Sequence, residues 1–142
     1  MIHSAIILFC LVGLFSCSNQ TPGPDKLEQR VKALWDAKKN KDLKTIYQLH
    51  EKSFREKTTE EKFLKKRPID VIDYEFQKVE LTDKGRSGKS FVKMKIKGMG
   101  GFVFEPMVSD VWVVEDGEWC LKYMPPKNLF ENARPKTADS PQ

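Results

Sequence analysis

The 142-residue chain is long enough for one domain but short for two. Its 25 Lys and Arg residues against 20 Asp and Glu give a net charge of +5, and the basic excess falls in the first half of the chain. Such an excess is typical of a solvated helix surface, or of a surface that faces an anionic membrane. Nucleic-acid binding is not expected, because no recognition motif is present and the basic residues are not interleaved with stacking aromatic residues.

The N-terminus indicates an export signal. The stretch from Ile2 to Phe15 is almost wholly apolar, but it is shorter than the roughly 20 residues that a transmembrane helix needs, and it fits a signal-peptide core. Its end, Leu14-Phe15-Ser16-Cys17, resembles the lipobox of bacterial lipoproteins. An ordinary cleaved signal peptide, or a structural role for the cysteine, remains the alternative interpretation.

The lipobox resemblance implies several features of the mature protein. Residues 1–16 would be removed as the signal peptide, and Cys17 would carry acyl chains such as palmitate as the first residue of the mature chain. Residues 17–24 would form a flexible tether, since they are polar and contain Pro and Gly. Ser18 after the cysteine implies sorting to the outer membrane, so that the domain would face the periplasm.

The remaining cysteine does not indicate a site. If Cys10 leaves with the signal and Cys17 is the anchor, only Cys120 stays in the domain, and one cysteine cannot form an intrachain disulfide. We interpret Cys120 as a small buried hydrophobe rather than a nucleophile. With two histidines in the whole chain, no metal-ligand spacing exists, and no metal or cofactor is expected.

Three amphipathic helices are predicted after the tether. The first starts at a capping box with Asp25 as N-cap and Glu28 three residues later. Asp42 caps the second, whose apolar side extends through His50 towards Phe54. A third box, Thr58-Thr59-Glu60-Glu61, opens the last helix, which is expected to end before Pro68.

Alternating apolar residues then predict strands. Tyr74 and Phe76 have one parity while Val79 and Leu81 have the other, which predicts a β-bulge near Gln77-Lys78. A loop is expected over 83–88, a strand over 90–97, a turn over 98–101 and a long strand bent at Pro106. The lysines at 93, 95 and 97 should point out of the sheet.

The most clearly patterned stretch covers residues 108–123, VSDVWVVEDGEWCLKY. Asp116-Gly117 between two apolar runs predicts a two-residue hairpin that sets Trp112 opposite Leu121 and Asp110 opposite Tyr123. The face that carries the large aromatic residues should be the core wall. Residues 127–142, beyond the sheet, are predicted to be a disordered tail.

Residues 25–126 are thus predicted to form one α+β domain, in which three N-terminal helices pack on a four-stranded antiparallel sheet. The helical pair VxxLWDAKKNKDLKTIYQL, the segment FREKTTEE and the hairpin VWVVEDGEW together resemble the nuclear transport factor 2-like superfamily, which includes the ketosteroid-isomerase and SnoaL types. The resemblance implies a curved sheet that wraps the helices into a cone, often around an apolar pocket. Because members include isomerases, dehydratases, cyclases and non-enzymatic binding domains, the fold leaves the function open.

Two sets of candidate site residues follow. Asp110 with Tyr123 is a candidate acid pair, because a carboxyl in apolar surroundings has a raised pKa and can donate a proton; the plainer alternative is a solvated carboxylate at the end of the core. Four aromatic residues could wall a ligand pocket or simply fill the core: Trp35, Tyr47, Trp112 and Trp119.

The preferred functional hypothesis is a non-catalytic envelope lipoprotein that binds a small apolar ligand or another envelope protein. One alternative is an isomerase- or hydratase-like enzyme that uses Asp110 with Tyr123. Another is a structural or accessory subunit of an envelope complex. A monomer or weak homodimer is expected, because the row of Lys93, Lys95 and Lys97 would oppose close sheet-to-sheet packing.

Overall fold

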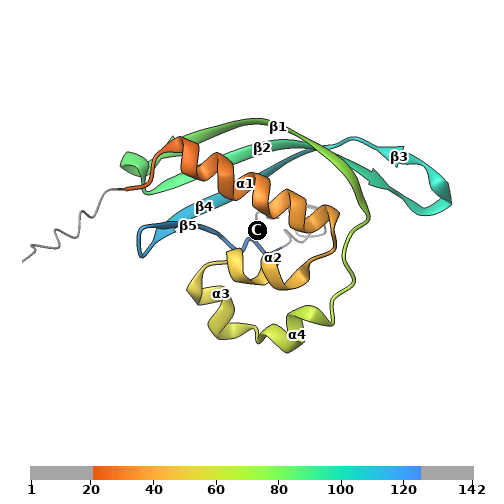
Figure 1. The fold of residues 1–142 in the computed structure, drawn as a ribbon, viewed down its shortest axis with the longest axis horizontal. Coiled ribbons are helices and arrows are strands. Elements are labelled where there is room, and N and C mark those ends of the chain that lie inside the picture. The colour runs from red at the N-terminus through yellow and green to blue at the C-terminus, as the bar shows by residue number, and fades with distance from the viewer. Residues whose placement is uncertain (1–20, 126–142) are drawn as a thin grey trace, which may run out of the picture.

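The computed structural model describes residues 21–125 (Figure 1). The predicted signal peptide 1–16, the lipidation site Cys17 and the predicted tail 127–142 lie outside the described residues. Within them the chain has an α+β fold, with four α-helices followed by an open antiparallel sheet of five strands. The α+β class is confirmed, while the number of helices and strands differs from the prediction.

Helix α1 (Pro24–Lys39) begins earlier than the sequence pattern indicated. Its N-cap is Gly23, no side chain caps it, and Asp25 lies inside the first turn, so the predicted capping box is wrong. The reason is Pro24 at the first helical position, where its fixed φ favours helix initiation and its missing N–H costs nothing. Pro22 is buried, and the Trp119 indole donates to the Gly23 carbonyl oxygen at 3.4 Å. The packed structure therefore includes Pro22, upstream of the predicted start at Asp25.

The next segment forms three short helices where two were expected: α2 (Leu43–Leu49), α3 (Lys52–Lys57) and α4 (Glu60–Leu64). The predicted Asp42 cap of α2 is confirmed, since its side chain accepts a hydrogen bond from the Thr45 N–H. Helix α2 ends at His50 because the chain there becomes extended and bridges to Leu121 at the edge of the sheet. Phe54 consequently belongs to a separate helix.

The sheet contains β1 (Val71–Thr82), β2 (Ser87–Lys97), β3 (Val103–Phe104), β4 (Met107–Glu115) and β5 (Glu118–Leu121). Its order is β1-β2-β4-β5, and β3 also pairs with β2. A shift in the β1–β2 register between Phe76 and Lys78 confirms the predicted bulge. The long strand expected around Pro106 is divided into β3 and β4, because proline cannot donate to the ladder.

The predicted hairpin is confirmed around its turn. Asp116 and Gly117 both have positive φ, and Trp112 lies opposite Leu121. The expected pairing of Asp110 with Tyr123 is not formed, because β5 ends at Leu121. The Tyr123 N–H donates instead to a carboxylate oxygen of Glu51 at 3.0 Å.

The core lies between α1 and the sheet, which covers one face of this helix (Figure 1). The fully buried Leu27, Val31 and Leu34 of α1 share one core cluster with Val92 and Trp112 of the sheet. Gly88 was expected in a loop but lies in β2, where a β-carbon would meet the Leu27 side chain at 2.8 Å. A residue without a side chain thus allows α1 to approach β2 closely.

The segment that follows β2 and contains β3 extends beyond the helices as a finger, defined here as residues 98–107 (Figure 1). It lies at the end of the domain opposite residue 21, where the described chain begins. Phe102, Phe104 and Met107 of this finger are exposed, Phe102 by 70%. The domain therefore shows an apolar surface at the finger in addition to its core.

Candidate ligand-binding pocket

An apolar pocket of about 280 Å³ lies between the helices and the sheet. Trp35 of α1 and Ile46 of α2 contribute to its helical side. Val71, Met94 and Val108, from three different strands, contribute to its sheet side. Because every layer of the domain supplies a wall, the pocket is a product of the tertiary fold rather than of one motif.

Three basic residues line the same pocket: Lys38 of α1 and the consecutive Lys66 and Arg67, which follow α4. The Lys38 ammonium lies 3.8 Å from the centre of the Trp35 ring and 3.7 Å from Oδ2 of Asp110. Burial lowers the pKa of Lys38, and the attraction of Asp110 opposes part of that effect. The Lys66 ammonium lies 4.8 Å from the centre of the Phe63 ring. We call Lys38, Lys66 and Arg67 the basic rim.

Two polar atoms near this rim have no hydrogen-bond partner among the described residues. One is Nε1 of Trp35, and the other is Oδ2 of Asp110, since the 3.7 Å to Lys38 is too long for a hydrogen bond. Leaving a buried polar group unpaired costs about 1–3 kcal/mol. The neighbourhood of the pocket therefore has unused hydrogen-bonding capacity; the third unpaired buried polar atom of the described residues, Nε of Arg55, does not line it.

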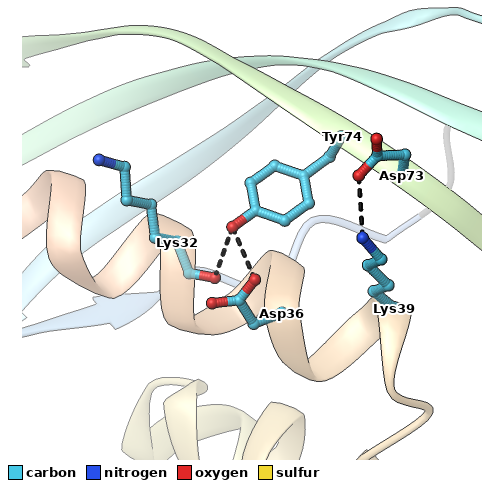
Figure 2. Close-up of polar contacts among 5 residues, drawn as sticks. All are labelled: Lys32, Asp36, Lys39, Asp73 and Tyr74. Atoms are coloured by element: carbon cyan, nitrogen blue, oxygen red, sulfur yellow. Dashed lines mark hydrogen bonds and ion pairs between the residues drawn. The ribbon is translucent and has the colours of Figure 1, made fainter.

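Polar contacts join α1 to β1 next to Trp35 and Lys38, and Figure 2 shows them for Asp36, Lys39, Asp73 and Tyr74. The Tyr74 hydroxyl donates to Oδ1 of Asp36 at 2.8 Å, and Lys39 pairs with Asp73 at 3.0 Å. Burial and the Asp36 carboxylate raise the pKa of Tyr74 to about 12, so its phenol stays protonated. The Tyr74 and Trp35 rings lie 6.0 Å apart, which fixes Trp35 from the side of β1.

Of the four aromatic residues proposed as pocket walls, the structure places only Trp35 in this pocket. Tyr47 donates its hydroxyl proton to the Thr58 carbonyl oxygen at 2.9 Å. Trp112 is fully buried and donates to Ser90, and Trp119 is buried and donates to Gly23. Each of the last three thus contributes its ring to packing and its polar atom to a hydrogen bond within the fold.

The two candidate acid residues are not brought together. Asp110 lies on β4 opposite Ser90 of β2 and forms its ion pair with Lys38. Tyr123 lies beyond the end of β5, and its ring packs 4.8 Å from the ring of Phe54. The predicted pair depended on the β4–β5 register, but the last pair of that ladder is Trp112 with Leu121, so Asp110 and Tyr123 are not paired.

Sequence reasoning missed the basic rim. Lys38 could have been found, because it follows Val31, Leu34 and Trp35 at helical spacing and therefore belongs to the buried face of α1. Lys66 and Arg67 carry no such signal. They reach the pocket only because the chain turns there from α4 towards β1.

Other kinds of site find little support within residues 21–125. This part of the chain contains no cluster of His, Cys, Asp and Glu side chains suited to a metal ion. Cys120 is buried, and that burial raises the pKa of its thiol, which makes it a poor nucleophile. None of the helices described is long and apolar enough to cross a membrane.

Comparison with known proteins identifies the fold but no family. No family model and no curated protein matches the sequence. Among solved structures, the chain is similar to the solution structure of a SEC-C motif-containing protein from Rhodopseudomonas palustris, with a TM-score of 0.54 and 14% identity. The similarity covers 68% of this chain and 74% of that protein. At this identity the two proteins share a fold, and nothing further follows from the likeness.

Proposed function

We propose that the protein is a lipid-anchored binding protein of the bacterial envelope that holds a small apolar molecule in the pocket described above. The single observation that carries the binding role is the pocket itself, which has walls from α1, α2, α4 and three strands. The proposed anchor at Cys17 is supported by the lipobox-like sequence at residues 14–17. The domain would sit on the outer membrane and face the periplasm.

The pocket has the features of a small-molecule site. Its volume of about 280 Å³ lies near the lower end of ligand pockets, roughly 300–1,000 Å³. Its lining is mainly aliphatic and aromatic, with few charged groups, as is typical of such sites. A sheet curved into a cone around the helices, as in the nuclear transport factor 2-like superfamily, would enclose a ligand of this size.

A photolabelling experiment tests the binding role. The mature protein, held in phosphatidylcholine nanodiscs, is illuminated with a neutral long-chain alcohol that carries a diazirine, and labelled peptides are identified by mass spectrometry. We expect saturable labelling of the segment 43–71, which contributes most of the helical side of the pocket. Leu43→Trp, which fills the pocket from a half-buried position, should reduce labelling roughly tenfold, equivalent to about 1.4 kcal/mol of binding energy.

The matched control is Leu64→Trp, the same exchange at an exposed residue of α4 that does not line the pocket. This variant should be labelled like the wild type. Equal labelling of the Leu43→Trp variant, or labelling only at the finger, would reject the pocket. The finger would then be the apolar surface available to the accessory-subunit alternative.

A further inference from the structure

We propose that the ligand of this pocket is a fatty-acid-type carboxylate, with its acyl chain against the apolar walls and its carboxylate at the basic rim of Lys38, Lys66 and Arg67. This inference rests on the binding role proposed above and adds the chemical class of the ligand. It follows from three observations, namely the charge of the rim, the excess of hydrogen-bond donors and the apolar walls beside them.

The fold neutralises the positive charge of the rim only in part, since Arg67 interacts with Asp70 at longer range, where it helps to lower the pKa of that carboxyl. Lys38 has a partial counter-charge in Asp110 at 3.7 Å. Among the described residues, no carboxylate lies within 4.0 Å of the charged atoms of Lys66 or Arg67. The nearest acidic residue in sequence, Asp70, is held by Lys41 in an ion pair. An anion is therefore the charge-complementary occupant of the part of the pocket next to the rim.

The polar side chains that line the pocket are all donors, whereas the acceptor Asp110 lies behind Lys38 and is not part of the lining. Lysine and arginine only donate hydrogen bonds, and Trp35 adds an indole N–H that has no acceptor among the described residues. An ionised carboxylate only accepts, so its two oxygens complement such a set. A neutral alcohol would bring a donor of its own and no charge. It would thus add no counter-charge to the three cations of the rim.

The walls next to the rim suit a hydrocarbon chain. Ile46, Val71 and Val108 present aliphatic side chains, and Met94 adds a flexible one that adapts to irregular shapes. Basic and apolar surfaces thus lie side by side in one pocket, so a molecule that satisfies both must be an amphiphilic anion. A polar anion such as free phosphate would leave the apolar walls unused.

The test is a competition experiment with the same photoreactive alcohol. Protein in phosphatidylcholine nanodiscs is labelled in the presence of rising concentrations of dodecanoate, of dodecanol or of lysophosphatidylglycerol. The double variant Lys66→Gln/Arg67→Gln removes two charges of the rim. The control Lys44→Gln/Lys89→Gln removes the same number of charges at exposed lysines that do not line the pocket.

We expect the rim variant to raise the half-competing concentration of dodecanoate by about tenfold or more, as for the loss of a charge-assisted contact. Dodecanol should compete equally well with wild type and rim variant, and the control should resemble the wild type throughout. Comparing variants for one competitor cancels the different partitioning of the two amphiphiles into the bilayer. High salt should weaken competition by dodecanoate but not by the neutral dodecanol, because it screens the rim.

Failure of this inference is distinguishable from failure of the binding role. If the alcohol labels the pocket but dodecanoate competes no differently with the rim variant, the carboxylate assignment is overturned and the binding role stands. Stronger competition by lysophosphatidylglycerol than by dodecanoate would also overturn it, in favour of a phosphate headgroup. Absence of saturable labelling would remove the binding role itself.

Discussion

Ser90 of β2 and Trp112 of β4 form the most deeply buried polar pair of the described domain. Both residues are fully buried, and the indole N–H of Trp112 donates to Oγ of Ser90 at 3.0 Å. The hydroxyl is the hydrogen-bond acceptor that the structure provides for this indole. The pair therefore lets a large aromatic ring enter the core without leaving an unpaired donor.

We expect Ser90→Ala to lower the free energy of unfolding by about 1–3 kcal/mol, because the indole N–H would stay buried without an acceptor. Urea unfolding followed by tryptophan fluorescence measures the change. The control is Ser109→Ala on β4, where the side chain is exposed and the change should stay within about 0.5 kcal/mol. Equal stability of Ser90→Ala and the wild type would contradict the pairing.

The aromatic residues proposed for the pocket were only partly predictable from the sequence. Strand alternation correctly places Trp112 and Trp119 on the core face. It cannot tell a ring that fills the core from one that borders a cavity, since both point inward. That distinction depends on partners distant in sequence, such as Gly23 for Trp119. The basic rim was missed for a related reason, because a lysine pattern is usually read as solvent-facing.

Helix α2 is the element whose N-terminus was predicted best. The two carboxylate oxygens of Asp42 accept from the backbone N–H of Thr45 at 3.0 Å and from its hydroxyl at 2.6 Å. These hydrogen bonds lower the pKa of Asp42, the side-chain bond contributing most. The cap matters for the pocket, because α2 carries Leu43 and Ile46 into its wall.

Asp42→Ala should destabilise the protein by about 0.5–2 kcal/mol, the usual cost of losing an N-cap. Asp25→Ala provides the comparison, since Asp25 was the predicted cap of α1 but lies within the first turn of that helix. Its loss should cost about 0.3–1 kcal/mol at most, through the helix dipole alone. Thermal unfolding of both variants measures the difference. A larger effect at Asp25 would favour the sequence-based cap over the structure.

The turn, the bulge and the cap of α2, which local chemistry determines, were therefore predicted correctly. The ends of elements that depend on contacts distant in sequence were missed. The Asp116-Gly117 turn and the bulge near Gln77-Lys78 follow from local rules and are confirmed. The division of the second predicted helix at His50 depends on the N–H of Glu51, which donates to the Leu121 carbonyl oxygen at 3.0 Å. A contact between residues so far apart leaves no periodic signal in either segment.

At the scale of the whole molecule, composition and element order predicted the α+β class, and the likeness to a solved structure supports a known fold. Membership of the nuclear transport factor 2-like superfamily stays a prediction. The expected monomer or weak dimer also stays a prediction, although the lysine row on which it was based is not as strongly charged as expected. Lys93 and Lys95 lie 2.9 and 3.5 Å from the carboxylate of Glu105, so this row of lysines is partly neutralised within the chain.

Membrane attachment is the remaining whole-molecule prediction, and two mechanisms compete for it. The net charge of +5 could hold the protein on an anionic surface, whereas acyl chains on Cys17 would hold it by hydrophobic insertion, stably when there are two or more. Salt separates the two, because at 1 M the Debye length falls to about 3 Å and exposed charges are screened.

We expect the wild-type protein to stay with membranes after a high-salt wash and to leave them only in detergent. Cys17→Ser should move it to the salt-soluble or soluble fraction, as quantified by immunoblotting of fractionated cells. Cys120→Ser, which changes a buried thiol in the domain and leaves Cys17 intact, should fractionate like the wild type. Release of the wild-type protein by salt alone would show that electrostatic attraction holds it on the membrane, and would contradict the proposed lipid anchor.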